Sequence, residues 1–257
     1  MSDPREEAPA IAIRGLAKVY DQVIAVNGVS FDVPGGSFFG LVGPNGAGKT
    51  TTLSMATGLL RPDAGQVWIN GVNMWEESLE AKKKLGVLAD GVRLFDRLSG
   101  RQLVTYAGLL RGMDRETVAE RIQDLLRALD LTDAGDKLVV DYSAGMTKKI
   151  SLASAMIHAP RTLVLDEPFE AVDPVSAANI RGILNDYVTH GGTVVVSSHV
   201  MDLVQRMCSH VAVMARGNLL AIGTVDEVRQ GSSLEDRFVD LVGGRSTGEG
   251  LEWLHTF

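Results

Sequence analysis

The chain has 257 residues, which allows one domain or two small ones and is long enough to bury a core. Apolar residues make up 45% and charged residues 22%, the proportions of a globular protein, which excludes disorder over the whole chain. The net charge of −7 argues against a protein that grips nucleic acid with its whole surface, and we predict no nucleic-acid partner.

The start of the chain and its apolar runs give no targeting or membrane signal. The first ten residues, MSDPREEAPA, are acidic and polar, so we expect a flexible N-terminus over residues 1–10 rather than a secretory signal. The single cysteine, Cys208, excludes an internal disulfide. The longest apolar runs, such as residues 194–196, are far shorter than the ~20 residues of a membrane helix. Work at a membrane therefore requires a partner.

The predicted elements begin with strands over residues 11–33, which are rich in β-branched and alternating side chains. Three short apolar runs predict strands buried on both faces: residues 38–42, 163–165 and 193–196. A helix to about Leu60 follows the first run, and a helix from about Pro174 to His190 separates the other two. Strand, helix and strand at this spacing predict βαβ units and a parallel sheet.

The middle of the chain predicts helices instead. Val118, Ile122 and Leu129 recur at helical spacing with charges on the opposite face, and residues 102–110 and 147–158 predict further helices. We expect an inserted helical subdomain over about residues 96–158, within a domain that spans residues 11–225.

Residues 226–257 predict a C-terminal helix and tail. Ser232 and Glu235 fit a capping box that opens a short helix to about Val242. A Gly/Ser-rich link over residues 243–250 follows. The apolar last residues, 251–257, either pack back on the domain or contact a partner, and the sequence leaves both open.

Residues 43–50, Gly-Pro-Asn-Gly-Ala-Gly-Lys-Thr, match a phosphate-binding loop between a predicted buried strand and a predicted helix. The glycines let backbone N–H groups turn inward around phosphate oxygens, and the helix points its positive end at the anion. Lys49 would neutralise the β and γ phosphates, and the Thr50 hydroxyl would ligate Mg²⁺. The predicted ATP-binding residues here are Gly43, Pro44, Asn45, Gly46, Ala47, Gly48, Lys49, Thr50 and Thr51.

Two carboxylates end the apolar run Leu163-Val164-Leu165, at the kind of strand end where ligands gather in a parallel sheet. Asp166 would hold Mg²⁺, largely through water, and Glu167 would orient and deprotonate the attacking water. Behind a phosphate loop this pattern predicts a nucleoside triphosphatase. It disfavours a P-loop kinase, because Glu167 directly follows Asp166 and is placed to activate water.

Further motifs narrow the class of ATPase. Residues 142–146 open a helix, Asp173 follows the carboxylates, His199 follows the last apolar strand, and Tyr20 precedes the phosphate loop. Each alone also has a purely structural reading, but in this order the chain resembles the nucleotide-binding subunit of an ABC transporter over roughly residues 10–225. The resemblance implies an α/β fold: a RecA-like P-loop NTPase core with a parallel sheet, an early antiparallel β portion and an inserted helical subdomain.

By this resemblance, two such subunits meet head to tail, with each ATP between the phosphate loop of one and the signature helix of the other. Ser143, Ala144 and Gly145 would then act across the interface near the γ-phosphate. Asp173 would link the two sites. ATP supplies charge at the interface, so the dimer would close with ATP and loosen after hydrolysis.

The resemblance also implies roles within the chain's own site. Tyr20 would stack on adenine. His199 would contact the γ-phosphate and hold Glu167 and the water in place. The implied catalytic residues are Glu167, His199 and Lys49.

The sequence departs from the usual family pattern at two positions. The signature reads Tyr-Ser-Ala-Gly-Met in place of Leu-Ser-Gly-Gly-Gln, and Met146 cannot hydrogen-bond as glutamine would. The Q-loop glutamine is replaced by Asp90, which adds a hard ligand for Mg²⁺ beside Thr50 and Asp166 but reaches less far. We expect an active Mg²⁺-dependent ATPase whose turnover is slower than usual.

The implied partners are a multi-span membrane permease and a second nucleotide-binding subunit, as a homodimer or a heterodimer. The chain would then lie at the cytoplasmic face of the membrane, held peripherally through the permease. Residues 91–99 and the C-terminal helix look most like ATPases paired with type-2 exporters. The alternatives are a soluble ABC-type ATPase with a regulatory or mechanical role, and a nucleotide-binding scaffold that has lost hydrolysis. The transported substrate stays open.

Overall fold

The computed structural model describes residues 8–91 and 93–243. Its strands are β1 (Ile11–Tyr20), β2 (Val23–Val33), β3 (Phe38–Val42), β4 (Ala64–Ile69), β5 (Val72–Asn73), β6 (Leu85–Leu88), β7 (Thr162–Leu165), β8 (Thr193–Ser198), β9 (His210–Ala215) and β10 (Asn218–Thr224). Its α-helices are α1 (Lys49–Ala56), α2 (Ser78–Lys83), α3 (Gly100–Leu110), α4 (Arg115–Ala128), α5 (Ala144–Met156), α6 (Pro174–Thr189), α7 (Met201–Met207), α8 (Val225–Arg229) and α9 (Leu234–Leu241). Short 3-10 helices, η1 (Thr132–Ala134) and η2 (Val139–Asp141), join α4 to α5.

Within the described residues the strands form two sheets. An antiparallel sheet has the order β2-β1-β4-β5, and a larger sheet has the order β10-β9-β3-β8-β7-β6. In the larger sheet all neighbours are parallel except β9 and β10, so the predicted parallel sheet is confirmed. The carboxyl ends of β3, β7 and β8 therefore lie at one edge, where the segments that follow them meet.

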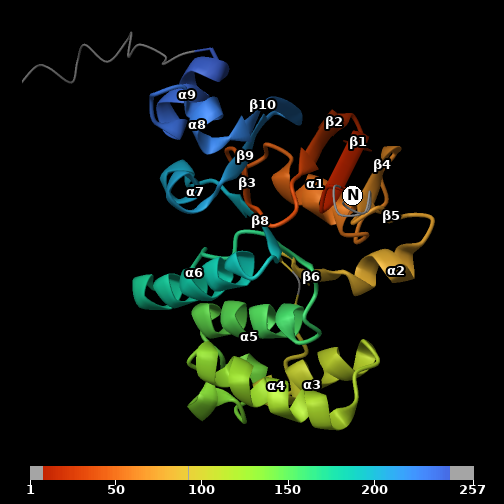
Figure 1. Cartoon of the computed structure of the whole chain (residues 1–257), viewed down its shortest axis with the longest axis vertical. Helices are drawn as coiled ribbons and strands as arrows, with labels where there is room; N and C mark the ends of the chain where they lie inside the picture. The colour runs from red at the N-terminus through yellow and green to blue at the C-terminus, as the bar shows by residue number, and fades with distance from the viewer. Residues whose placement is uncertain (1–7, 92, 244–257) are drawn as a thin grey trace, which may run out of the picture.

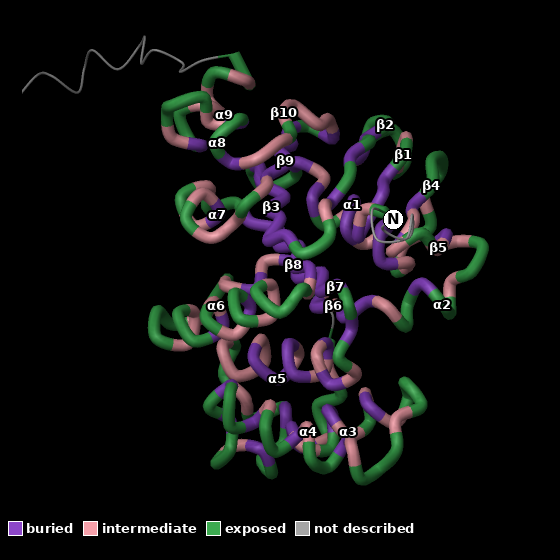
Figure 2. Tube along the Cα trace, viewed as in Figure 1, coloured by how far each residue is buried: buried purple, intermediate pink, exposed green. Residues whose placement is uncertain are grey.

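The strands at the centre of the larger sheet are buried along their whole length, as Figure 2 shows for β3 and β8. Such strands read as continuous apolar runs because helices or another sheet cover both faces. One core joins the two sheets around α1, and the rings of Phe31 and Phe39 stack there with centroids 5.6 Å apart. Burial of each large apolar side chain contributes about 1.5–3 kcal/mol.

The predicted helical segment is present as α3, α4 and α5, which Figure 1 shows as a block on the far side of the larger sheet from α8 and α9. Side-chain caps fix where these helices begin. Ser99 and Gln102 form a capping box at α3, Asp114 caps α4, and Ser143 caps α5. The buried stripe of α4 joins the second core of the molecule.

The helix after the phosphate loop is shorter than we expect from the sequence. α1 ends at Ala56, not near Leu60, and the N–H groups of Leu59 and Leu60 turn back to the carbonyl oxygen of Ser54. Gly58 then takes a left-handed conformation with φ of 72°, which terminates the helix.

The ends of the described chain also differ from the prediction. Ala10 is buried and its N–H donates to the carbonyl of Val33, so the residue just before β1 is already held to β2. The expected tail contains the additional helix α8, which packs with α9 in a third core. The cap of α9 is Ser233 rather than Ser232, since the Ser233 hydroxyl accepts from the N–H of Asp236. The predicted link and the apolar residues 251–257 lie outside the described residues.

Several strands lie where none is predicted from the sequence above, among them β4, β6, β9 and β10. β9 and β10 form a hairpin around Arg216 and Gly217, both with positive φ. β10 is only half-buried, although residues 219–222 within it are all apolar. Among the described residues, no helix is long and apolar enough to cross a membrane.

The structure predicts a pH-dependent loss of stability through His158. Burial, with the nearby Arg111 charge, lowers the pKa of His158 from 6.5 to about 4, and its Nε2 lies 2.9 Å from the carbonyl oxygen of Leu85. Because the folded pKa is the lower one, stability is full above pH ~6.5 and falls as pH drops toward 4. We expect a loss of about 1 kcal/mol between pH 7 and pH 5 once solvent screening is allowed for, measured by urea unfolding.

The substitution His158→Gln should remove this part of the pH dependence. His190→Gln, at the exposed end of α6, is the matched control and should leave it in place. An unchanged pH dependence in His158→Gln would contradict the assignment.

Candidate functional site

The loop between β3 and α1 curls so tightly that glycine is required at two of its positions. A Cβ on Gly43 would lie 2.1 Å from the carbonyl oxygen of Met214, and one on Gly48 would lie 2.5 Å from that of Ala25. Gly48 also has φ of 99°, which L side chains rarely adopt. The loop therefore packs its backbone against β9 and β2 and ends at the N-terminus of α1, a ready site for a phosphate group.

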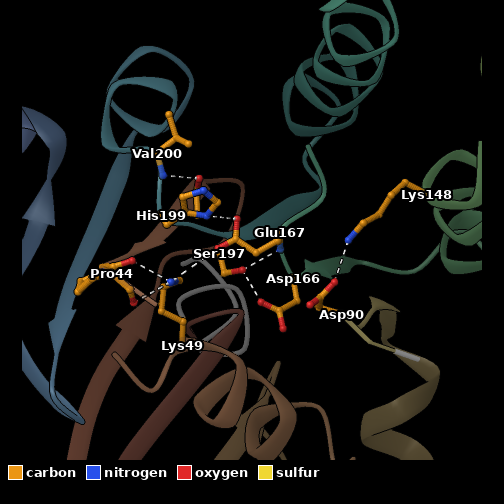
Figure 3. A network of polar contacts seen from close by, with 11 residues as sticks. Pro44, Lys49, Asp90, Lys148, Asp166, Glu167, Ser197, His199 and Val200 are labelled. Carbon is orange, nitrogen blue, oxygen red and sulfur yellow. Dashed lines mark hydrogen bonds and ion pairs between the residues drawn. The ribbon is translucent and has the colours of Figure 1, made fainter. Parts of the chain in front are cut away.

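Lys49 is the cation at the centre of this loop, and its side chain is only 6% exposed. Its ammonium donates to the carbonyl oxygens of Gly43 at 2.8 Å and Pro44 at 3.2 Å, and it lies 3.6 Å from Glu167 Oε1 (Figure 3). These contacts balance a buried charge that would otherwise destabilise the fold. They also hold the ammonium where an incoming phosphate would meet it.

Asp166 lies at the end of β7 and is 3% exposed. The hydroxyl of Ser197, on the neighbouring strand β8, donates to Asp166 Oδ1 and accepts the N–H of Glu167 at 2.8 Å. One serine thus orients both carboxylate residues. Ser197 is not among the residues predicted from sequence; the available signal was a hydroxyl at the carboxyl end of an apolar strand.

Glu167 takes a left-handed backbone conformation, with φ of 45°, which is uncommon for a residue with a side chain. This turn aims its carboxylate into the space between Lys49 and His199 (Figure 3). Oε2 lies 3.2 Å from His199 Nδ1, and Oε1 faces the Lys49 ammonium. Backbone strain of this kind gathers at functional sites. The arrangement gives one carboxylate two orienting partners at the wall of the site.

A cavity of about 710 Å³ opens in front of these groups, within the size range of small-molecule sites. Its lining includes the predicted residues Tyr20, Asn45, Gly46, Ala47, Gly48, Lys49, Thr50, Thr51, Asp90, Glu167 and His199. The β1–β2 hairpin forms one wall, with Tyr20, Val23 and Ile24 exposed toward solvent. Arg216 and Glu170 also line the cavity, and the sequence analysis did not single them out.

The residues predicted to hold a metal supply only oxygen donors. Thr50 lies in the first turn of α1, Asp166 ends β7, and Asp90 follows β6. Among the described residues, no group of three His, Cys, Asp or Glu side chains is arranged to hold a metal ion. This sparse donor set fits Mg²⁺, which keeps several waters and takes further ligands from phosphate oxygens. Asp90 is already paired, with its Oδ1 3.1 Å from the Lys148 ammonium.

The signature residues and Asp173 do not line this cavity. Of the described residues around it, none is Ser143, Ala144, Gly145 or Asp173. Ser143 is exposed and its hydroxyl accepts from the N–H of Met146 at 3.2 Å. Asp173 is exposed and accepts from the N–H groups of Val175 and Ser176, both at 3.0 Å. The hydrogen bonds from Ser176 lower the pKa of Asp173, and the charge of the nearby Lys149 lowers it further.

Ser143, Ala144 and Gly145 nevertheless lie close to the segment before Asp173. A Cβ on Gly145 would be 3.7 Å from the carbonyl oxygen of Ala171. The structure thus brings the signature helix and this loop together on a surface of their own. Within one chain Ser143 caps α5 and Asp173 caps α6.

The chain matches the family model described as ABC transporter over residues 26–170. It is 32% identical to the linearmycin resistance ATP-binding protein LnrL of Bacillus subtilis, over 81% of this chain and 67% of that protein. It is 33% identical to the daunorubicin/doxorubicin resistance ATP-binding protein DrrA of Streptomyces peucetius, over 86% of this chain and 67% of that one. It is 34% identical to the Nod factor export ATP-binding protein I of Rhizobium sp. (strain N33), over 84% of this chain and 71% of that protein.

Solved structures show the same fold. An ATP-binding subunit of an ABC transporter superposes with a TM-score of 0.84 at 25% identity, covering 91% of this chain and 99% of that one. A dimeric ATP-binding cassette in a post-hydrolysis state, bound to ADP and Pi, superposes with a TM-score of 0.77 at 21% identity, covering 84% and 98%. The expected α/β architecture, with its antiparallel β portion and helical segment, is therefore confirmed.

The Ser197 contacts predict a measurable loss of stability on substitution. Ser197→Ala leaves Asp166 and the N–H of Glu167 without their buried partner, so we expect the free energy of unfolding to fall by about 1–3 kcal/mol. Urea unfolding checks this. Ser198→Ala, which removes only an acceptor for the N–H of Val200, is the neighbouring control and should cost less. Equal losses in the two variants would count against a special role for Ser197.

Proposed function

Because the chain belongs to the ABC transporter family, as an ATP-binding subunit, we propose that it hydrolyses Mg²⁺–ATP in the cavity beside residues 43–50 and thereby drives export through a separate membrane permease. The observation that carries the proposal is Glu167, held between Lys49 and His199 at the open end of the phosphate loop. A phosphate-binding loop alone would serve many nucleotide-dependent proteins, whereas a base aimed at its mouth supports hydrolysis.

ATP binding follows from the charges and dipoles of the loop. Its backbone N–H groups and the N-terminus of α1 would surround the phosphates, and Lys49 would neutralise the β and γ groups. Tyr20, which also lines the cavity, would stack on adenine. Thr51 and the remaining loop residues would contact the phosphates nearer the adenine.

Hydrolysis would use the carboxylate at the loop mouth. Glu167 would take a proton from water as the water oxygen attacks the γ-phosphorus, and the bond to ADP would break. His199 would hold Glu167 and contact the γ-phosphate. Thr50, Asp166 and Asp90 would hold Mg²⁺, directly or through water. When bound, Mg²⁺ would offset the charge that develops on the phosphate oxygens.

A head-to-tail dimer is supported by the exposed surface that carries Ser143 and Asp173. Neither residue lines the cavity of its own chain, and the two lie on adjoining segments, since a Cβ on Gly145 would be 3.7 Å from the carbonyl oxygen of Ala171. In a dimer, Ser143, Ala144 and Gly145 of one chain would close the site of the other. Val175, an exposed apolar residue beside Asp173, suits burial in such an interface.

A permease partner is supported by an apolar groove between α2 and α3, with a volume of about 520 Å³. Leu59, Leu79 and Leu110 line it and are exposed, and the basic residues Lys82, Lys83 and Arg111 also border it. The groove would accept a short amphipathic helix of the permease that carries acidic residues. The chain would then lie peripherally at the cytoplasmic face of the membrane. The relatives named for drug resistance and for export support the direction of transport.

The role of Glu167 is tested by Glu167→Gln, which keeps the shape of the side chain but removes the base. We expect phosphate release to fall by ~10²–10⁴, with ATP still bound and an ATP-dependent dimer stabilised in size-exclusion chromatography. Lys49→Ala, by contrast, should abolish tight ATP binding in a nucleotide titration. Near-normal turnover in Glu167→Gln would remove Glu167 from the role of base.

The permease is tested by affinity purification of the tagged protein from detergent-solubilised native membranes, with co-purifying chains identified by mass spectrometry. We expect a multi-span membrane protein in near-stoichiometric amount. Leu110→Asp, in the groove, should abolish its recovery, whereas Val242→Asp, an exposed position at the end of α9, should not. Recovery of soluble partners alone would refute transport and favour a soluble ABC-type ATPase.

A further inference from the structure

An ion pair crosses from the wall of the nucleotide cavity to the signature helix. Asp90 follows β6 and lines the cavity, and Lys148 lies on α5, with its ammonium 3.1 Å from Asp90 Oδ1 (Figure 3). The Lys148 side chain is 17% exposed and that of Asp90 is 44% exposed. Neither residue makes another ion pair within the described part of the chain.

The position of Asp90 brings this ion pair close to the space where a metal would bind. Asp90 shares the cavity wall with Thr50 and Glu167, so its carboxylate borders the space where the phosphates and their metal would lie. A carboxylate that keeps a short contact with an ammonium has less negative charge to offer a second cation. Lys148 and a magnesium ion therefore compete for one group.

We propose that Lys148 is a positioning residue that holds Asp90 away from the metal in the nucleotide-free chain, and that Asp90 exchanges Lys148 for Mg²⁺ when Mg²⁺–ATP binds. The inference rests on the proposed function, since it requires ATP and its metal in this cavity. It adds to that function a competing contact. The ion pair between Asp90 and Lys148 must break before Asp90 contributes to binding Mg²⁺.

The exchange also connects the cavity to the surface used by a second chain. Ser143 caps α5, so Lys148 lies little more than one turn along the helix that follows it. While the ion pair is intact, α5 is tied to the segment after β6. When Asp90 turns to Mg²⁺, that tie is released, and the helix that carries Ser143 is free to adjust to the other nucleotide of the dimer.

The test is the affinity for a fluorescent ATP analogue, measured on the full chain with Mg²⁺ and again with EDTA. Lys148→Met removes the ammonium and keeps the apolar stem. Because the competing contact is gone, we expect binding with Mg²⁺ to tighten about two- to five-fold, the range that a half-exposed ion pair provides. Binding in EDTA should not tighten, because no metal is present for Asp90 to hold. Arg127→Met, which breaks an exposed ion pair with Asp124 on α4, should alter neither affinity.

Two further variants separate exchange from a merely structural role. Lys148→Arg keeps the charge and should retain the affinity of the unaltered chain in Mg²⁺. In an Asp90→Asn background, Lys148→Met should produce no Mg²⁺-dependent change, because no carboxylate remains to be released. Unchanged or weaker Mg²⁺–ATP binding in Lys148→Met, or the same tightening in the Asp90→Asn background, would overturn the exchange. If the unaltered chain itself binds no ATP with Mg²⁺, the proposed function fails instead.

Discussion

The alignment of β3, β7 and β8 at one edge of a parallel sheet is the constraint on which the rest of the site depends. Val42 pairs with Ser198, and Leu165 with Val196, so the segments after these three strands emerge side by side. Hydrogen bonds between fully buried strands set this register, and a slip by one residue would turn every side chain to the opposite face. The phosphate loop, the two carboxylates and the histidine owe their proximity to it.

Charges at this edge are buried, and the fold compensates each of them. Lys49 is surrounded by carbonyl oxygens, Asp166 has the Ser197 hydroxyl, and Glu167 lies between a lysine and a histidine. Ionised groups left without partners in such a place would cost several kcal/mol each. The same contacts that stabilise these charged groups also orient them. The stability of the sheet edge and the geometry of the site therefore have one cause.

The chain nevertheless carries only part of what the chemistry requires. Donors that would face the γ-phosphate from the other side, led by Ser143, lie on a separate surface and serve as helix caps in the single chain. The ion pair between Asp90 and Lys148 links that surface to the cavity wall. The cavity, the separate surface of donors and the ion pair between them lie apart within one chain. This arrangement suits a subunit whose activity depends on assembly with a second copy or with a related ATP-binding subunit.

Much of the fold and of the candidate site could be predicted from sequence because the signals were local. The run Phe38–Val42 is buried on both faces and therefore continuously apolar, and the tight loop after it needs glycine where a Cβ would strike the backbone. The amphipathic stripe of α4 likewise lies within one segment. β10 is only half-buried and shows no clean alternation, and α1 ends early at the left-handed Gly58, which apolar spacing does not reveal.

The sequence by itself thus determined the chemical groups, their order and most of the local elements, because spacing along the chain is enough to specify these. The tertiary structure alone decided which groups share one cavity. It brought Ser197 to both Asp166 and Glu167, gave Asp90 a lysine as its partner, and kept Ser143 and Asp173 away from the phosphate loop. These outcomes depend on strand register and helix packing between segments far apart in the chain, which no local pattern encodes.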